Sequence, residues 1–421
     1  METLVLSLVA GAFAAVVSVV LIYFGPLKGG GVAAFVVIIG LTFLLPFYAY
    51  LMLVLFKPVV DSLYALRFGP LKITQAFSVY SIAIWGIFLF LKRSVRRPIT
   101  YMDTSHLLLL LPVPFVLLFS PNVRGLDLSL RILSGWGFYF VAREIDLKNA
   151  RWIEMAFLLS ALFPTVMGVL ALSGHLPNGF QEGAFERLKG PYHDATAFGF
   201  ELVPGFLVLL HRLGRKFNLL EFALIVVMVF LFYKTYTRAL WVSVFLSSVV
   251  VAFRREAKGG KLAPALLLVL IVGGAIYFYP EISARFSHHG LGTDPDSFNG
   301  RMLIWREGFR RFLSLHPLAM FFGLITTRKP IGLYLHNTYF TFLIDMGIFG
   351  FTIFMAWLLN VTRFVLSCRG EYSGLLRAAF LFVVISGITS GGVLYPNFQW
   401  FFLTVLGLAM NDHVSRVRGQ V

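Results

Sequence analysis

Long apolar segments recur along this chain and are separated by short polar intervals. Many of them run for about 15 to 25 residues, close to the length with which an α-helix crosses the hydrocarbon core of a membrane. Because lipid cannot hydrogen-bond the backbone, segments of this kind predict a helical protein that crosses a membrane many times. We expect about 13 spans, within a range of about 12–14, near Leu4–Phe24, Val32–Phe56, Ile73–Leu91, Ser105–Phe119, Leu128–Val141, Trp152–Leu172, Thr196–Leu210, Leu219–Tyr233, Ala239–Phe253, Leu262–Phe278, Thr338–Leu359, Leu375–Leu394 and Gln399–Met410.

The composition supports this prediction. Of the 421 residues, 58% are hydrophobic and 13% are charged, with a mean hydropathy of +0.82. Soluble domains are nearer half apolar and a quarter charged, so these side chains cannot be hidden in one soluble core. We therefore predict an all-α polytopic membrane protein, with residues 1–421 as a single integral membrane domain. The N-terminal stretch METLVLSLVAG lacks the basic start of a signal peptide and is interpreted as an uncleaved first span.

The net charge of +16 fits basic loops that are held in the cytoplasm, and nucleic acid is not needed to explain it. The basic segments alternate along the chain, so all of them can face the cytoplasm together. They are Lys92 to Arg97, Arg143 to Arg151, His211 to Lys216, Arg254 to Lys261, Arg363 to Arg369, and the tail with Arg416 and Arg418. The segments expected on the outer side are Ser120–Asp127, Ser173–Ala195, Lys234–Arg238 and Glu281–Asn337.

The alternation of basic segments does not decide the orientation of the first spans. It places the N-terminus outside, together with Lys57, Arg67 and Lys72. If Val32–Phe56 is instead two short spans broken near Pro46, the N-terminus returns to the cytoplasm.

The segment from 281 to 337 is the longest polar interval and is predicted to be a large periplasmic loop within the domain. Basic residues are disfavoured in short outer loops, so their excess here indicates an anionic partner. The cations are Arg285, Arg301, Arg306, Arg310, Arg311, Arg328 and Lys329, against Glu281, Asp294, Asp296 and Glu307.

Asn299 to Leu313 has a helical pattern inside this loop, and Pro317 follows it. One face is apolar and the basic side chains lie largely off it, which predicts a helix along the membrane surface with its aromatic side buried. The apolar face holds Met302, Trp305, Phe309, Phe312 and Leu313, and the residues off it are Arg306, Arg310 and Arg311.

Three arginines on the predicted outer face, Arg187, Arg238 and Arg301, are candidates for binding phosphate. A guanidinium group stays charged and donates two parallel hydrogen bonds, which suits a phosphate group. The alternative is that each arginine extends to the lipid headgroups.

His336 is the candidate base. Asn337 follows it and precedes an apolar span, so we expect Asn337 to cap the helix that begins there. His336 would then lie at the positive end of a helix, which favours a neutral imidazole that can accept a proton. The alternative is a histidine that hydrogen-bonds a loop carbonyl.

The acidic residues offer weaker signals. Asp345 and Glu201 lie at membrane depth, where acids are costly and often functional, or else pair with an arginine or with the backbone of a broken helix. Asp294 and Asp296 have the spacing of a metal-binding pair, but Asp-Pro-Asp-Ser is also a turn sequence, which we favour. The single cysteine, Cys368, excludes an intrachain disulfide and a cysteine metal cluster.

Several short motifs, taken in order, resemble the O-antigen ligase and O-antigen polymerase superfamily. They are DTSHLLLLLPVPFVLLFSPN, TRALW, NGRMLIW, HNTYFTFLIDMGIFGF and NFQWFFLTVLGLAMN, and they span about residues 103–411. RLKGPYHDATAF is similar to an Arg-x-x-Gly segment of the family, with Asp194-Ala195 in place of its usual Asn-containing end.

The resemblance implies an inverting, metal-independent glycosyltransferase with a GT-C-like fold and no cofactor. Its donor would be a glycan on undecaprenyl pyrophosphate, with the active site on the periplasmic face of the bacterial inner membrane. By this resemblance His336 would be the catalytic base. The remaining site residues implied are Arg238, Arg301 and Arg187 on the pyrophosphate, with Asn337, Asp345, Arg306 and Arg310 in supporting positions.

The acceptor stays open at this stage. A ligase would use the lipid A-core oligosaccharide, and a polymerase would use a second lipid-linked unit. The single large loop before His336 favours the ligase, because Ser173–Ala195 is shorter and less basic. A flippase or transporter of lipid-linked sugars is the third hypothesis, but we find no internal repeat of the kind such proteins show.

Overall fold

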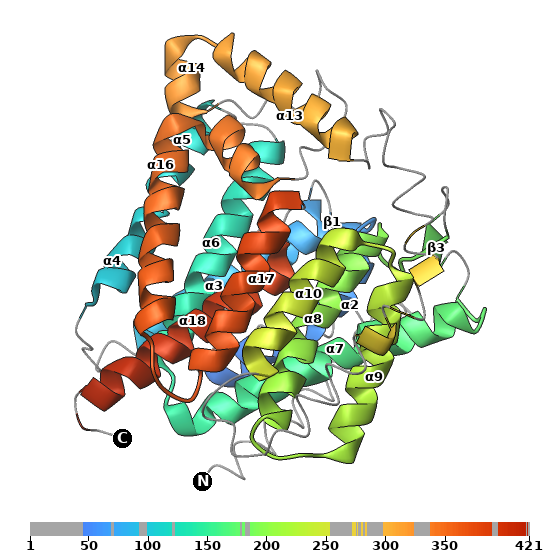
Figure 1. Cartoon of the computed structure of the whole chain (residues 1–421). Helices are drawn as coiled ribbons and strands as arrows, with labels where there is room; N and C mark the ends of the chain where they lie inside the picture. Colours follow the sequence, from blue (N-terminus) through green and yellow to red (C-terminus); the bar gives the residue numbers. More distant parts are fainter. Residues whose placement is uncertain are drawn as a thin grey trace, which may run out of the picture.

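The computed structural model is a bundle of helices (Figure 1). The structure describes residues 45–68, 71–91, 99–119, 123–176, 179–181, 186–252, 272–274, 276, 279–280, 283, 298–323, 337–389, 395–417 and 419. The helices are α2 (Pro46–Ser62), α3 (Ile73–Leu91), α4 (Tyr101–Leu108), α5 (Pro112–Phe119), α6 (Val123–Glu144), η1 (Leu147–Asn149), α7 (Ala150–Leu172), α8 (Ala195–Leu213), α9 (Leu219–Lys234), α10 (Arg238–Ala252), α13 (Phe298–Leu313), α14 (Pro317–Phe322), α16 (Thr338–Ser367), α17 (Ser373–Thr389) and α18 (Pro396–Val417).

Two short antiparallel ladders accompany the helices. Strand β1 (Arg67–Phe68) pairs with β2 (Leu71–Lys72) directly before α3. Strand β3 (Phe180–Gln181) pairs with β4 (Arg187–Leu188) between α7 and α8. Both ladders lie outside the apolar helices, so the chain is an all-α polytopic membrane protein, as predicted.

Four helices of the described part are long and apolar enough to cross a membrane: Ile73–Phe90, Leu147–Leu172, Ala195–Leu213 and Thr338–Ser367. Shorter apolar helices cover Tyr101–Val116, Arg238–Val251 and Ser373–Ile388. The expected spans Leu4–Phe24 and Leu262–Phe278 fall mainly or wholly outside the described residues, so the total of about 13 stays a prediction.

Helix α18 lies within the bundle and packs closely along α6. A Cβ added at Gly407 would lie 2.3 Å from the carbonyl oxygen of Tyr139, so only glycine permits this approach. Beside it, Trp400 is fully buried and stacks on Phe138 at 4.3 Å between ring centroids. Small residues and interlocking rings of this kind hold helices together in lipid, where apolar burial by itself gives little drive to associate.

Two predicted spans are broken in the structure. The span expected at Thr338–Leu359 is interrupted at Gly347, where φ is 68° and ψ is −175°, so α16 consists of two pieces. The span expected at Ser105–Phe119 divides into α4 and α5, with a turn before Pro112. Gly347 adopts a backbone conformation that is almost confined to glycine, and Pro112 has no N–H to continue the helix.

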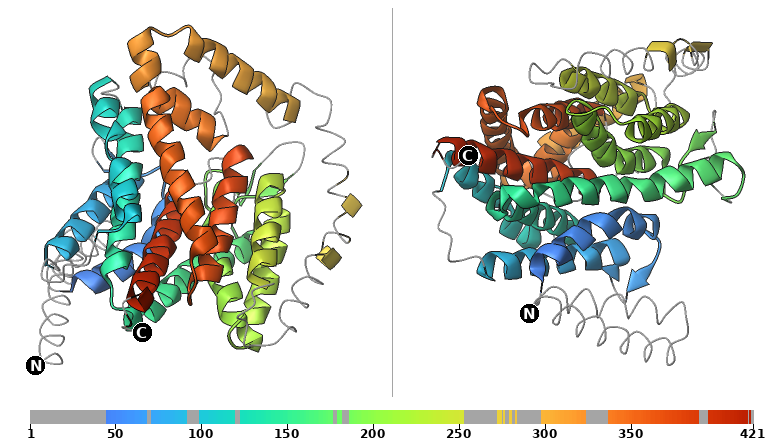
Figure 2. Two further views of the ribbon diagram at one scale, coloured as in Figure 1. Left: turned by 60° about the vertical axis from the view of Figure 1, so that its left-hand side comes forward. Right: turned by 90° about the horizontal axis from the view of Figure 1, so that it is seen from below.

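The two ends of the bundle differ. The ends of α7, α8, α17 and α18 meet through charged contacts at one end, at the bottom of Figure 1. Arg215 pairs with Glu371 and Glu154, and the backbone N–H of Glu371 donates to Asp412. This end gathers the segments predicted to be cytoplasmic, 143–151, 211–216 and 363–369. The segments near 187, 235–238 and 337 lie at the opposite end (Figures 1 and 2).

The first described span ends later than predicted. We expected it to end at Phe56, but α2 continues to Ser62 and includes Lys57. Lys57 is 1% exposed and pairs with Asp61 one turn later. This ion pair lowers the cost of burying the lysine and lets the helix continue past the end of the apolar pattern.

Candidate active site

Arg187 in β4 joins two segments that are far apart in the chain. Its Nε donates to the carbonyl of Thr235 at 3.1 Å, and its Nη2 donates to the Thr237 hydroxyl at 3.0 Å. A longer bond of 3.5 Å reaches the hydroxyl of Thr196 in α8. Arg187 therefore holds the turn between α9 and α10 against the start of α8.

The turn held by Arg187 has an uncommon backbone. Tyr236 has φ of 50°, the only positive φ outside glycine in the part of the chain that the structure describes. This left-handed residue ends α9 and allows α10 to begin two residues later, at Arg238. The indole N–H of Trp241 donates to the carbonyl of Phe232 at 2.7 Å and closes the turn. An uncommon backbone conformation of this kind persists only where the surrounding contacts impose it, and such conformations cluster at functional sites.

Asn337 connects the start of α16 to the same end of the bundle. Its Oδ1 accepts from the backbone N–H of Phe340 at 3.0 Å, which confirms the predicted helix cap. Its Nδ2 donates to the carbonyl of Ile388, near the end of α17, at 2.9 Å. Because α10 packs along α17, the start of α10 with Arg238 and the start of α16 lie at one end of the molecule.

Arg301 lies on α13, which runs across this end with its N-terminal part above the ends of α17 and α10 (Figures 1 and 2). Trp305, one turn after Arg301, stacks on Phe340 at 5.7 Å between ring centroids. Ile304 and Phe312 are buried in a small cluster with Ile344. Arg301 is half-buried, in contrast to the exposed Arg306.

The predicted helix 299–313 is confirmed, but its apolar face is divided. Trp305 and Phe312 pack on α16, whereas Met302, Phe309 and Leu313 are 43–55% exposed. The aromatic side of α13 therefore packs partly on α16 and is partly exposed.

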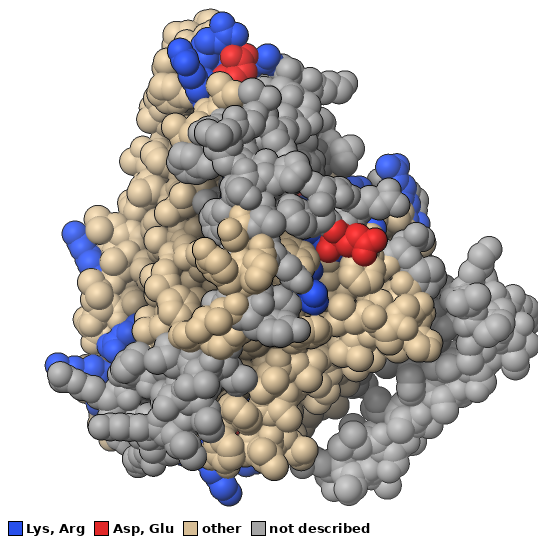
Figure 3. Space-filling model, turned by 45° about the vertical axis from the view of Figure 1, so that its right-hand side comes forward, with Lys and Arg blue, Asp and Glu red and all other residues tan. Residues whose placement is uncertain are grey.

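Arg306 and Arg310 are exposed on α13. Arg310 and Arg311 both donate hydrogen bonds to Glu307. These bonds lower the pKa of Glu307 to about 2, and the bond from Arg310 has the larger effect. Figure 3 shows basic side chains gathered around an acidic one over this part of the molecule. Arg310 thus pairs with Glu307 on α13, whereas Arg187 holds the turn before Arg238.

The segment between Arg187 and α8 ends in a second local network. The carboxylate of Asp194 accepts from the backbone N–H of Ala197 at 2.7 Å and caps α8, and it pairs with His193 at 2.6 Å. Burial by itself would raise the pKa of Asp194. The hydrogen bond and charge of His193, the Ala197 N–H and the charge of Arg187 outweigh burial and lower it below the usual range. Asp194 is thus a charged cap beside the arginine-held turn.

The helices that begin at this end include α8 after its cap Asp194, α10 at Arg238 and α16 after its cap Asn337. The start of a helix carries unpaired N–H groups and partial positive charge, which attract anions. The Asp194 carboxylate offsets this charge at α8. The starts of α10 and α16, with the guanidinium groups of Arg187 and Arg238, are therefore the positive features suited to a phosphate or pyrophosphate group.

Several candidate residues cannot be placed. His336 lies outside the described residues, as do Asp294, Asp296, Arg328 and Lys329.

Asp345 lies in the last turn before the break in α16 and is half-buried. Among the residues that the structure describes, no group of three or more His, Cys, Asp or Glu side chains could hold a metal ion.

Sequence reasoning missed the threonines of the turn, Thr235 and Thr237, which receive the hydrogen bonds of Arg187. The sequence TYTR offered a signal, because a polar run between two apolar helices marks a short, constrained connection. The reasoning also missed Asp61 and Asn397. Both lie beside Glu201, for which we considered a functional role or, as the alternative, a pairing with an arginine or with the backbone of a broken helix.

Comparison with known proteins identifies one segment. Residues 223–355 match the family model described as O-antigen ligase. The matched segment runs from α9 into α16 and contains Arg238, Arg301, His336, Asn337 and Asp345, whereas Arg187 lies before it. No curated protein matches the chain.

Proposed function

We propose, from its place in the O-antigen ligase and polymerase superfamily, that this membrane protein transfers a glycan from undecaprenyl pyrophosphate to an acceptor hydroxyl. The observation that carries the proposal is the contact of Arg187 with the turn that directly precedes Arg238. This contact gives a positive region at the end of the bundle opposite the basic cytoplasmic segments. Such a region suits a lipid-linked pyrophosphate presented on the periplasmic face of the inner membrane.

The reaction breaks the bond between the anomeric carbon and the pyrophosphate oxygen. The acceptor oxygen forms the new bond from the opposite face, which inverts the configuration. Negative charge grows on the leaving pyrophosphate, and Arg238 and Arg301, with Arg187, stabilise it in place of a metal ion. The helix starts at Arg238 and Asn337 add fixed partial positive charge.

His336 accepts the proton of the acceptor hydroxyl, a role that contributes roughly 10²–10⁴ in rate. Asn337 caps α16 and is tied to α17, so it fixes the backbone from which the preceding histidine extends. Asp345, Arg306 and Arg310 have supporting roles in this proposal.

The preferred acceptor is the lipid A-core oligosaccharide, which makes the protein an O-antigen ligase. The alternative is a polymerase, whose acceptor is a second lipid-linked repeat unit and whose chemistry is the same. The family match favours glycosyl transfer over a flippase or transporter.

Purified protein in liposomes tests the proposal directly. We expect it to consume lipid-linked glycan and form a new glycosidic bond without a membrane potential when lipid A-core is supplied. Extension of a second lipid-linked unit instead would assign a polymerase. Movement of intact lipid-linked glycan across the bilayer, with no new bond to either acceptor, would contradict the transferase and support a flippase.

A further inference from the structure

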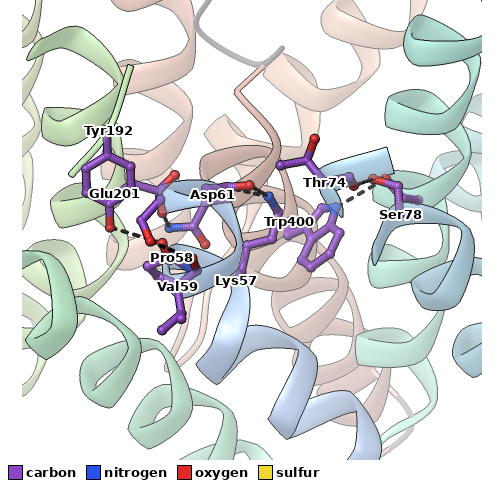
Figure 4. Close-up of polar contacts among 12 residues, drawn as sticks. Lys57, Pro58, Val59, Asp61, Thr74, Ser78, Tyr192, Glu201 and Trp400 are labelled. Atoms are coloured by element: carbon purple, nitrogen blue, oxygen red, sulfur yellow. Dashed lines mark hydrogen bonds and ion pairs between the residues drawn. The ribbon is translucent and has the colours of Figure 1, made fainter. Parts of the chain in front are cut away.

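A buried cluster of charged side chains lies between α2, α8 and α18 (Figure 4). It consists of Lys57 and Asp61 from α2, Glu201 from α8 and Asn397 from α18. Lys57, Glu201 and Asn397 are 1%, 5% and 1% exposed, and the side chain of Asp61 is 15% exposed. The Nζ of Lys57 lies 5.2 Å from the ring centre of Trp400, a cation–π contact that adds to its pairing with Asp61.

The cluster holds more acid than one lysine can neutralise. The carboxyl groups of Asp61 and Glu201 belong to the same cluster (Figure 4), and Asn397 Nδ2 donates to Glu201 Oε2 at 2.7 Å. A hydrogen bond between two carboxyl groups needs one proton, because two ionised carboxylates offer only acceptors and repel each other. The cluster with one shared proton is neutral: one lysine, one carboxylate and one carboxylic acid.

Asn397 is suited to either protonation state. Its Oδ1 is buried and has no hydrogen-bond partner among the described residues. In the present orientation the amide N–H donates to Glu201. Rotated by half a turn, the same amide presents Oδ1 as an acceptor for a carboxylic O–H. The amide can therefore follow the proton as it moves between the two carboxyl groups.

A further titratable group beside the cluster is Tyr192, which connects it to the candidate active site. The Tyr192 hydroxyl donates to the carbonyl of Pro58 in α2 at 3.2 Å (Figure 4). Tyr192 belongs to the segment that begins at Arg187 and ends at the Asp194 cap of α8. Glu201 lies two turns further along α8, about 10 Å below the cap.

We propose that Asp61 and Glu201 share one proton, and that this proton site positions the segment from Arg187 to Asp194 for binding the anionic donor. The inference rests on the proposed function. With the proton in place, α2 and α8 are held together and Tyr192 stays on Pro58, so Arg187 meets the turn before Arg238. Without it, two carboxylates face one lysine, α2 separates from α8, and donor binding weakens before the chemical step does.

Glu201→Gln is the decisive variant, because glutamine keeps the shape and can donate as a protonated glutamate does. Steady-state kinetics with lipid-linked glycan are measured over about pH 6 to 9, a range in which a buried carboxyl group can titrate. For the wild type, we expect the KM for donor to rise by up to about tenfold per pH unit once the proton is lost. For Glu201→Gln, we expect a normal KM at low pH and no alkaline rise.

Tyr192→Phe is the matched control. It removes the link to Pro58 and leaves the proton site, so we expect a raised KM with the alkaline rise retained. An identical dependence of KM on pH in wild type and Glu201→Gln would overturn the proposal.

Thermal unfolding of the detergent-solubilised proteins over the same pH range gives a second measurement that does not require activity. We expect the Tm of the wild type to fall with rising pH more steeply than that of Glu201→Gln. If the wild type transfers no glycan, the proposed function fails while this comparison still decides the proton site. Parallel unfolding curves would then overturn the proton site as well.

Discussion

Gly323 and Gly347 approach each other so closely that neither position has room for a side chain. A Cβ on Gly323 would lie 2.6 Å from the backbone nitrogen of Gly347, and a Cβ on Gly347 would lie 2.4 Å from that of Gly323. Both residues have positive φ, 86° and 68°. The end of α14 thereby rests on the break in α16, and α13 and α14 are held over the start of α16.

We predict that Gly347→Ala destabilises the protein and lowers transfer. Alanine adds backbone strain of about 1–3 kcal/mol as well as a clash with the Phe321 carbonyl. Thermal unfolding and transfer by the purified protein measure both effects. The control is Gly86→Ala in α3, where a Cβ meets nothing within 4 Å and helix propensity favours alanine. Equal stability of the two variants would show that the break tolerates a side chain.

We predict that Arg238→Lys is poorly tolerated in transfer although the protein folds. Lysine keeps the charge at the start of α10 and loses the two-pronged hydrogen bond to phosphate. We expect at least about a tenfold loss of kcat/KM, because a charge-assisted hydrogen bond contributes about 1.5–3 kcal/mol. A lysine variant as active as the wild type would make Arg238 a lipid-headgroup contact. Arg369→Lys, an exposed residue at the opposite end of the bundle, is the control and should stay near normal.

His336→Ala should leave insertion and folding intact and reduce turnover by roughly 10²–10⁴. Asn337, which caps α16 and holds α17, is unchanged in this variant, so the helix start should be preserved. Turnover of lipid-linked glycan at saturating donor is the measurement. Near-normal turnover by well-folded protein would remove His336 as the base.

The Asp194 cap predicts an acid dependence of stability. The pKa of Asp194 is below its usual value of 3.8, so its stabilising contribution is present above that value and is lost as pH falls through the lower, folded-state pKa. Tm measured from about pH 5 downward should therefore fall less steeply for Asp194→Asn than for the wild type. Asparagine still caps a helix and carries no charge, so a parallel decline would assign the acid sensitivity to other groups.

Transfer should proceed undiminished in excess chelator, because fixed arginine charge can take the place of a metal ion on a leaving pyrophosphate. Replacing both Asp294 and Asp296 by asparagine should cost little activity. Loss of transfer in chelator, with recovery on addition of magnesium or manganese, would contradict this mechanism and make the pair metal ligands.

The sequence by itself determined the elements whose signal is local. Polar capping residues and apolar length predicted the cap at Asn337 and the helix from 299 to 313, which the structure places at 298–313. The alternation of basic segments likewise predicted which chain segments share an end, since charge is read along the chain without knowledge of packing.

Tertiary structure alone decided what each apolar or charged side chain contacts. Apolar periodicity cannot distinguish lipid from another helix, so it grouped Trp305, which packs on α16, with the exposed Phe309. It also missed the break at Gly347, whose cause is the approach of Gly323 from another segment. Lys57 pairs with an aspartate one turn away, but it also lies over the ring of Trp400, which is far away in the chain. Arg187 reaches the turn before Arg238 across 48 residues, and only folding brings the two together.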